Sequence, residues 1–549
     1  MTKFGFSQGT WRSLVRFVGL FGLCLALAIG CAGQQSDDAA DAPSEAAGEE
    51  TATGGRITMG TTQKVRTLDP ADSYEIFPGI LLYNMGDRLY TYEVGGTELV
   101  PQLATELPTI SEDGLTYTIP LREGVTFHDG SPFNAEVMAF SLQRFMENGG
   151  RPSFLLAEKI ESVEATGENE LTITLNSPFA AFTALLTFWG TTPVPMESYA
   201  IEEGSFQPDS FIGTGPYQLT EITPNTVRLS VFEDYWGDTP ANDGFDIQLF
   251  TSPANLYNAF RTQDVDIAYQ TLDPDQIADL QENADGWQVI EAGTTVINYM
   301  LLNQNQPPLD DVNVRQAVAA LIDRPLINER VFKGQAEPLY SLIPTSFDIY
   351  KPVFEEELGD GNAEKARELL EASGYSEDNP LELELWYPSS STERNLVATT
   401  LEASFEQQLP GLVDVQVNDV ESATAWPNLD KGIYPTFLLN WYPDFYDADT
   451  FIQPFMECKQ GSPEAGCEAG ANRAFYYSDR ANELIEQQRA ETDPDARGEY
   501  FVELQDILVE DVPYIPLWQN KDYVFAQEGV ENVSVEPTQQ FLLWKIEKS

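Results

Sequence analysis

The sequence predicts an α/β protein built from more than one domain. Segments in which apolar and polar residues alternate, as expected of strands, are interleaved along the chain with segments whose apolar residues recur at helical spacing. This mixture favours α/β domains over a β-sandwich or a helical bundle. The chain has 549 residues, more than one hydrophobic core organises, so we expect at least two domains.

A targeting signal opens the chain. The apolar run 17–29 follows several basic residues and is too short to span a bilayer comfortably, which indicates the core of a signal peptide. Residues 27–31 (LAIGC) resemble a bacterial lipobox, in which the cysteine is lipidated and becomes the new N-terminus. Residues 1–30 are therefore predicted to be a lipoprotein signal peptide, with Cys31 as the lipidation site. A secreted protein cleaved elsewhere is the alternative.

Residues 31–55 are predicted to be a flexible, acidic tether. From Gly33 to Gly55 the chain contains no aromatic and no basic residue. Such a segment cannot bury enough apolar surface to offset the entropy lost on ordering. A lipid anchor followed by a tether implies a globular body in the periplasm or at the extracytoplasmic face of a bacterial membrane.

The charge of the chain restricts its partners. The sequence holds 88 acidic residues against 30 basic ones, for a net charge of −58. This balance argues against nucleic acid and anionic membrane surfaces as partners. It is compatible with a saline habitat, and equally with the need to keep an exported protein soluble.

Enzyme motifs are scarce in the sequence. His128 is the sole histidine, so a Ser-His-Asp or Cys-His hydrolase is nearly excluded, and we expect a structural role for this residue. No Gly-Lys-Ser or Gly-Lys-Thr phosphate loop occurs, which argues against an ATPase of the phosphate-loop type. A hydrolase based on paired carboxylates stays open, because a large acidic protein contains many such pairs.

Two segments near the start of the body are predicted to be strands with one buried face. In both, apolar side chains alternate with threonines, which is the period of a half-buried strand. They are 115–121 and 171–175.

Three later segments are predicted to be helices, because apolar residues at helical spacing follow a residue that can cap a helix N-terminus. The capping residues are Asp310 or Asp311 for the first helix, Asn362 for the second and Asp493 for the third. Gly374 is placed to end the second helix, and Pro494 suits the first position of the third.

Two of the four cysteines remain for the globular body. Cys458 and Cys467 lie in a loop that contains Gly, Ser and Pro. In an exported protein such a pair indicates a disulfide. A zinc site would need more nitrogen or sulfur ligands than one histidine allows, and we expect no metal and no cofactor.

The segment 438–451 combines aromatic and acidic residues. Its aromatic residues are Trp441, Tyr442, Phe445 and Tyr446, and its acids are Asp444, Asp447 and Asp449. This mixture suits a ligand with apolar bulk and a cationic group, because binding pockets are mostly apolar with a few placed polar groups. The alternative is that the aromatic residues are core and the acids are solvated. Pro443 predicts a loop after the apolar run 436–439.

Several further motifs occur in a fixed order along the body. They are 67–70 (TLDP), 99–104 (LVPQLA), 113–118 (DGLTYT), 121–130 (LREGVTFHDG), 213–217 (GTGPY), 310–317 (DDVNVRQA) and 363–370 (AEKARELL). Together they resemble the family 5 extracellular solute-binding proteins, the dipeptide, oligopeptide and nickel receptors of ABC importers. The resemblance covers the chain from Ile57 to the C-terminus.

The resemblance implies a two-lobed fold of the periplasmic-binding-protein type, type II with an extra subdomain, in which the first lobe is discontinuous. By this analogy lobe one comprises 56–296 and the C-terminal return 517–549, and lobe two comprises 297–516. The extra subdomain, at 81–206, would enlarge the cleft between the lobes.

The resemblance also implies a ligand site. In peptide-binding members a Trp followed closely by an acid pairs with the α-ammonium of the ligand, and Trp441 and Asp444 match that pattern. Tyr442 and Asp447 lie in the same predicted cleft wall.

A second loop is expected to face the cleft at Trp386 and Tyr387. Dipeptide-type members often place an arginine for the ligand carboxylate at about this point, whereas this chain has Tyr387. Arg394 lies a little further on, so whether a carboxylate clamp exists stays open, and so does the choice between peptides and other ligands.

The function implied is that of a lipid-anchored receptor, not an enzyme. It would act as a monomer, capture a di- or oligopeptide between its lobes, and deliver it to an ABC permease with its ATPase. A sugar, an opine or a metal chelate is an alternative ligand on the same scaffold. A chaperone-like binder of unfolded chains is a further alternative.

Overall fold

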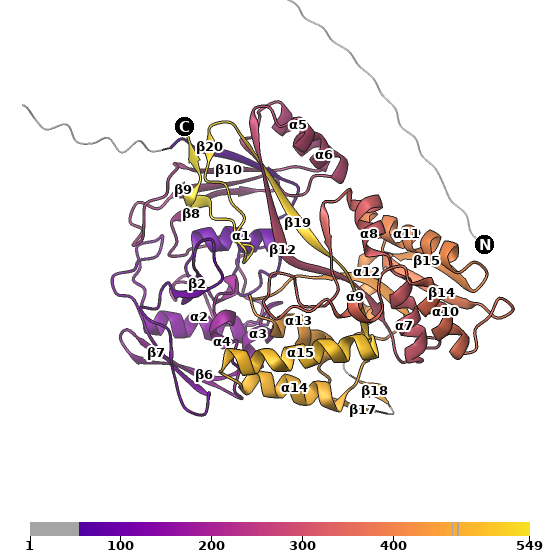
Figure 1. Ribbon diagram of the computed structural model, residues 1–549. Coiled ribbons are helices and arrows are strands. Elements are labelled where there is room, and N and C mark those ends of the chain that lie inside the picture. Colours follow the sequence, from indigo (N-terminus) through magenta and orange to yellow (C-terminus); the bar gives the residue numbers. More distant parts are fainter. Residues whose placement is uncertain (1–53, 464, 469–471) are drawn as a thin grey trace, which may run out of the picture. The chain divides into compact units, whose positions relative to one another are not determined.

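The computed structural model describes residues 54–463, 465–468 and 472–549, in which helices and strands are interleaved (Figure 1). The predicted interleaving of helices and strands is confirmed. The signal peptide, Cys31 and nearly all of the tether lie outside the described residues, so they stay predictions. Within the described residues, no helix has the length and apolar character needed to cross a membrane.

The largest sheet has nine strands. In sheet order they are β16 (Thr436–Trp441), β12 (Trp287–Leu302), β19 (Tyr514–Gln527), β11 (Ile267–Tyr269), β1 (Ile57–Thr61), β10 (Gly244–Leu249), β9 (Thr226–Val231) and β8 (Tyr217–Thr223), and β13 (Ala336–Pro338) pairs with β19 beside this path. β1 runs parallel to β10 and β11, whereas the other pairs are antiparallel.

β12 and β19 link β16, at one edge of this sheet, to β11 and the strands beyond it. Figure 1 shows them side by side, and they pair from Trp287 with Gln527 to Leu301 with Tyr514. The end of β12 also pairs with β16, and the end of β19 with β11. Their register is irregular between Gly293 and Ile297, so the ladder is interrupted midway along both strands.

A second sheet contains both strands predicted near the start of the body. Its order is β4 (Thr109–Ile110), β5 (Thr116–Pro120), β7 (Glu170–Leu175) and β6 (Ile160–Gly167). Tyr117 and Ile119 of β5, and Leu171 and Ile173 of β7, are buried, as the alternating pattern predicts.

A βαβ unit follows in the middle of the chain. It consists of β14 (Leu381–Pro388), α11 (Thr392–Gln408) and β15 (Val413–Val420), with the two strands parallel. The remaining strands form short pairs: β2 (Tyr90–Tyr92) with β3 (Leu99–Pro101), β17 (Gly461–Ser462) with β18 (Gly466–Cys467), and β20 (Val530–Glu531) with β21 (Glu547–Lys548).

The three predicted helices begin where their capping residues stand. They are α7 (Val312–Leu321), α10 (Ala363–Ala372) and α15 (Pro494–Asp511). The side chains of Asp311, Asn362 and Asp493 accept hydrogen bonds from backbone N–H groups of the first turns. Gly374 follows α10 with a φ of 88°, a left-handed conformation that favours glycine.

The other helices cover the sheets. They are α1 (Ile76–Met85), α2 (Ala135–Glu147), α3 (Phe154–Ala157), α4 (Phe182–Leu185), α5 (Pro253–Arg261), α6 (Pro274–Glu282), α8 (Arg324–Ile327), α9 (Val353–Glu357), α12 (Ser422–Leu429), α13 (Asp449–Met456) and α14 (Asp479–Ala490). Short helical turns occur at Trp189–Thr191, Asn328–Phe332 and Leu543–Lys545.

The buried apolar side chains of the described residues form four clusters. One lies within 297–518. A second lies within 89–188 and includes Phe445 from outside that range. The third combines residues before 269 with residues after 524, and a small fourth lies around α5 and α6. The segment 297–518 therefore has a core of its own, and the segments before and after it share another.

Candidate ligand-binding site

A cavity lies where the cluster within 89–188 meets the loop after β16. It contains about 680 Å³ of empty space, part of which is open to solvent. Its lining residues come from four segments far apart in the sequence: Ile76, Gly79, Ile80 and Tyr83; Thr187, Phe188 and Trp189; Tyr442 to Tyr446; and Thr538, Gln539 and Gln540, together with Tyr92 and Thr295.

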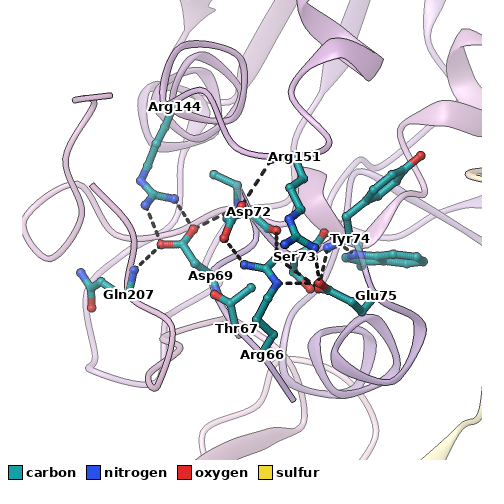
Figure 2. Close-up of polar contacts among 12 residues, drawn as sticks. Arg66, Thr67, Asp69, Asp72, Ser73, Tyr74, Glu75, Arg144, Arg151 and Gln207 are labelled. Carbon is teal, nitrogen blue, oxygen red and sulfur yellow. Dashed lines mark hydrogen bonds and ion pairs between the residues drawn. The ribbon is translucent and has the colours of Figure 1, made fainter. Parts of the chain in front are cut away.

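The TLDP motif fixes the segment that leads into α1. Both carboxylate oxygens of Asp69 accept hydrogen bonds from the guanidinium of Arg144, at 2.8 and 2.7 Å, and the pair is fully buried (Figure 2). Asp69 also accepts from the backbone N–H groups of Ala71 and Gln207. The motif acid is therefore structural, and it orients a helix that lines the cavity.

The next residues form an ion-pair network that ends beside the cavity. The guanidinium of Arg66 contacts Asp72 and Glu75, and Arg151 contacts Glu75 at 2.8 Å (Figure 2). Tyr74 lies between the two acids in sequence, and its hydroxyl donates a hydrogen bond to Asp444. The network thus holds a hydrogen-bond donor against the loop that follows β16.

Helix α1 approaches the cavity closely because it carries a glycine. A Cβ on Gly79 would lie 2.6 Å from the indole ring of Trp189. The indole N–H of Trp189 donates to the carbonyl of Ser73 at 3.0 Å. The ring therefore packs flat against the helix and forms one apolar wall of the cavity.

Asp444 is the acid of this cavity. Burial raises the pKa of its carboxyl to about 6, against the lowering effects of the hydrogen bond from Tyr74 and of the charge on Lys159. No ion pair is formed by Asp444 within the described residues. Among the described residues, the hydrogen-bond partner of this enclosed carboxylate is the neutral hydroxyl of Tyr74.

The loop containing Asp444 contacts the second core cluster. Phe445 is 8% exposed and packs edge-on against Phe179, with ring centroids 6.1 Å apart. The backbone N–H of Tyr446 donates to the hydroxyl of Tyr92 at 3.1 Å. The segment predicted as a cleft wall is therefore held between two cores.

The other two acids of the segment have arginine partners. Asp447 receives two hydrogen bonds of 2.7 Å from Arg497, and Asp449 receives two of 2.9 Å from Arg489. Neither acid lines the cavity. The structure thus places Asp447, which the sequence grouped with the ligand residues, in an anchor for the loop.

Trp441 is the last residue of β16 and does not line the cavity that contains Asp444. Its ring packs edge-on against Phe455, and its indole N–H is buried without a hydrogen bond. It borders a separate small cavity with Arg473 and Tyr514. The structure does not bring Trp441 and Asp444 together in one cavity.

The expectation that Trp386 and Tyr387 lie in a loop is wrong. Both belong to β14, whose alternating residues are buried. Trp386 packs on Tyr434, and the hydroxyl of Tyr387 meets the side chain of Asn395. The pattern of 381–387, in which leucines alternate with glutamates before these aromatics, is the strand signal that marks them as structural.

Arg394 is turned away from both cavities. Its guanidinium donates to the side-chain carbonyl of Asn440 at 2.6 Å, and its Nε is buried without a partner. Burial lowers the pKa of Arg394, whereas Glu393 and nearby tyrosines raise it. In this structure Arg394 does not act as a carboxylate clamp.

A second cavity adjoins the first at Tyr442. It contains about 1260 Å³ of empty space, part of it open to solvent, and it includes Gln270, Glu393, Lys521 and Asp522 in its lining. Tyr442 lines both cavities and is 40% exposed. The ring therefore stands at the boundary between two compartments.

Asp522 is the most enclosed charge of the second cavity. Burial raises the pKa of its carboxyl to about 7, and a hydrogen bond of 2.6 Å from the side-chain amide of Gln270 opposes this effect. Sequence reasoning missed Asp522. The available signal was one acid inside the run 514–527, where most residues are apolar or aromatic. Tyr74, also missed, gives no such signal.

The ring of His128 links two of the motifs. Its Nδ1 accepts from the backbone N–H of Gly213, and its Nε2 lies 3.0 Å from the carbonyl of Gly215, to which it donates. Burial lowers the pKa of His128 to about 4, so the ring is neutral. Its structural role, expected from the sequence, is confirmed.

No cluster of three or more His, Cys, Asp or Glu in the described residues is arranged to hold a metal ion. The disulfide between Cys458 and Cys467 is confirmed. It closes the loop that follows α13, away from both cavities.

The sequence was compared with known protein families. Residues 98–463 match the family described as bacterial extracellular solute-binding proteins, family 5, middle. The chain belongs to this family. As a family 5 solute-binding protein of the periplasmic type, it binds a solute for an ABC transporter, with its permease and ATPase, and is not an enzyme.

Relatives of this family 5 protein cover most of its length. The glutathione-binding protein GsiB of Escherichia coli K12 is 27% identical over 476 residues, which is 84% of this chain and 88% of GsiB. DppA of Helicobacter pylori, solved with the peptide STSA, has a TM-score of 0.76 at 22% identity and covers 90% of this chain and 98% of its own. NikA of Brucella suis, solved with Fe(III)-EDTA, has a TM-score of 0.78 at 20% identity and covers 90% and 100%. These structures share the two-lobed α/β fold predicted from the sequence.

Proposed function

We propose that this protein captures short peptides in the first cavity, and that Asp444 receives the ligand's free α-ammonium group. The observation that carries the proposal is that Asp444 is enclosed, faces the cavity and forms no ion pair with the described residues. A buried carboxylate without a partner weakens the fold, whereas an ammonium ion in the cavity would compensate for its burial.

The cavities favour peptides over strongly anionic ligands. The basic residue among the described lining residues of the two cavities is Lys521, and its ammonium group is 2.7 Å from Glu291. Glutathione and a metal–EDTA chelate carry more carboxylates than cations, so each would bring unpaired negative charge to acidic walls. A peptide that is neutral or cationic as a whole suits this site better.

We also propose that the lobes divide where the sequence places them, at 296/297 and 516/517. The separate cluster within 297–518 supports this division, and so does the irregular register between Gly293 and Ile297 of β12. Residues of the first cavity come from both sides of the boundary. A ligand that contacts both lobes favours their closure, because it binds the closed state better.

The last part of the proposed function is a lipid anchor and delivery of the ligand to a permease. The globular body, tethered through lipid on Cys31, would pass its ligand to the permease of an ABC importer. The sequence of residues 27–31 supports the anchor. Labelling of the full chain with a radioactive fatty acid, with Cys31→Ser as the control, tests it.

Replacing Asp444 tests the peptide site. Asp444→Asn keeps the size of the side chain and an acceptor for Tyr74, but it removes the charge. We expect affinity for a di- or tripeptide with a free amine to fall about 10- to 100-fold, since a charge-assisted hydrogen bond contributes roughly 1.5 to 3 kcal/mol. Isothermal titration calorimetry measures this change.

Acetylated peptides and a distant acid provide the controls. N-acetylation of the peptide should weaken binding to the wild type as much as Asp444→Asn does, and the two changes together should add little. Asp348→Asn removes an exposed acid that lines neither cavity and should leave affinity unchanged. Equal losses for free and acetylated peptides would remove Asp444 from this role.

A further inference from the structure

The second cavity is lined by Asp522, whose carboxylate forms no ion pair with the described residues. Asp522 belongs to β19, most of whose residues are buried. One of its oxygens accepts from Gln270, whose own side-chain carbonyl accepts from Gln63 at 2.7 Å. Neighbouring Lys521 does not neutralise Asp522, because its ammonium group pairs with Glu291 instead.

This arrangement contrasts with the enclosed acids that hold the fold together. Asp69, Asp447 and Asp449 each receive two hydrogen bonds from one arginine. Asp522, like Asp444, accepts a hydrogen bond from a neutral side chain and forms no ion pair with the described residues. An enclosed carboxylate without a cation destabilises a protein, and such groups cluster at functional sites.

Glu393 adds a second negative charge to the cavity. Its carboxylate makes no hydrogen bond and no ion pair with the described residues, and the adjacent Arg394 donates to Asn440 instead. Glu393 comes from α11 and Asp522 from β19, and both line the same space. Two elements distant in sequence therefore present acids to one compartment, which is separated from Asp444 by Tyr442.

We propose that the second cavity is a subsite for a second cationic group, with Asp522 as its counter-ion. This inference rests on the proposed function and narrows it: the preferred ligand is a peptide with a lysine-, ornithine- or arginine-like side chain besides its free amino terminus. An organic cation suits the site better than a metal ion, because the described residues hold no cluster suited to a metal.

Matched peptides test the subsite. Tripeptides with lysine at the first, second or third position are compared by calorimetry with the same peptides containing norleucine, which has a similar shape but no charge. For the wild type we expect lysine to bind at least about tenfold tighter at one position. In Asp522→Asn that preference should fall to less than about threefold, while affinity for the norleucine peptide is unchanged.

Asp348→Asn is the control variant, because Asp348 is an exposed acid that lines neither cavity. It should keep the preference for lysine. If it lost the preference as fully as Asp522→Asn, or if Asp522→Asn kept it, Asp522 would not be the counter-ion. Asparagine at 522 still accepts from Gln270, and thermal unfolding without ligand confirms that the variant folds.

The outcomes separate this inference from the peptide proposal. Norleucine peptides that bind as well as lysine peptides overturn the subsite and leave the peptide function standing. If no peptide binds, cadaverine, a simple diamine, serves as the probe: a rise in melting temperature for the wild type that is absent in Asp522→Asn supports the subsite without the peptide. If the protein binds neither the peptides nor cadaverine, both the subsite and the peptide function are overturned.

Discussion

At the scale of single residues, enclosed acids differ in their partners. Some hold segments together through an arginine, as Asp69 does with Arg144. Those that face the cavities, Asp444 and Asp522, have pKa values raised by burial to about 6 and about 7. Part of each population is therefore protonated near neutral pH, and a bound cation would favour the ionised form.

The neutral ring of His128 makes stability depend on pH. Its folded pKa of about 4 lies below the ordinary value of 6.5, so between these values the unfolded chain binds a proton that the folded chain does not. Its contribution is therefore present above pH 6.5 and is lost as pH falls. From about pH 7.5 to about pH 5 the expected loss is roughly 2 kcal/mol.

Asp444 and Asp522 act in the opposite direction, because their raised pKa values cost stability as pH rises. The effect of His128 on stability is therefore measured by comparing the wild type with His128→Gln. Asp444 and Asp522 are present in both proteins, so their contributions to the pH dependence cancel. Urea unfolding at about pH 7.5 and about pH 5 should show that His128→Gln lacks the loss of unfolding free energy expected for the wild type. An identical pH dependence in the two proteins would show that the ring titrates normally.

At the scale of elements, two helices anchor the ligand loop. Arg489 of α14 and Arg497 of α15 hold Asp449 and Asp447, which follow the cavity residues Tyr442 to Tyr446. Both ion pairs are largely buried. The loop is therefore held by ion pairs whose acids do not line the first cavity.

Arg497→Met removes one of these anchors. Since Asp447 would be left buried and unpaired, we expect a loss of about 3 to 5 kcal/mol in unfolding free energy. Peptide affinity should fall as well, because the loop that carries Asp444 loses its support. Denaturant unfolding and calorimetry measure the two effects.

Asp493→Ala is the comparison, since it affects the first turn of the same helix. It removes the cap of Ala496 N–H and should cost about 1 kcal/mol without changing peptide affinity. If the two variants weakened binding equally, the Arg497–Asp447 pair would have no special part in holding the loop.

At the scale of the whole molecule, Phe445 connects two cores. It follows β16, yet its ring lies in the cluster within 89–188. If the two regions are the lobes proposed above, Phe445 is an apolar contact that holds them together beside the first cavity.

Phe445→Ala should shift the molecule towards an open arrangement. Deleting a buried Phe ring costs about 3 to 5 kcal/mol, and here the loss falls on the contact between regions. We expect a larger radius of gyration by X-ray scattering without ligand, and weaker binding of lysine and norleucine peptides by the same factor. An unchanged radius, with affinity lost for one peptide only, would contradict this.

The sequence predicted more of the fold than of the site. Capping residues such as Asn362 and alternating strands such as 171–175 act through local physics, so they are visible in one segment of chain. Asp444 was placed correctly in a cavity wall, whereas Trp441 was not, because the face of β16 on which a side chain lies depends on its pairing with β12. Asp522 was missed because its neighbours Gln270 and Glu393 come from other elements.

The place of Tyr442 between the compartments has a consequence for ligand length. If one carboxylate stands on each side of the ring, a ligand must place its two cations at a separation that the protein sets. Molecules of equal charge but shorter or longer spacer would then reach only one acid. The position of Tyr442 would thus make the protein select ligands by the distance between their two cations as much as by their charge.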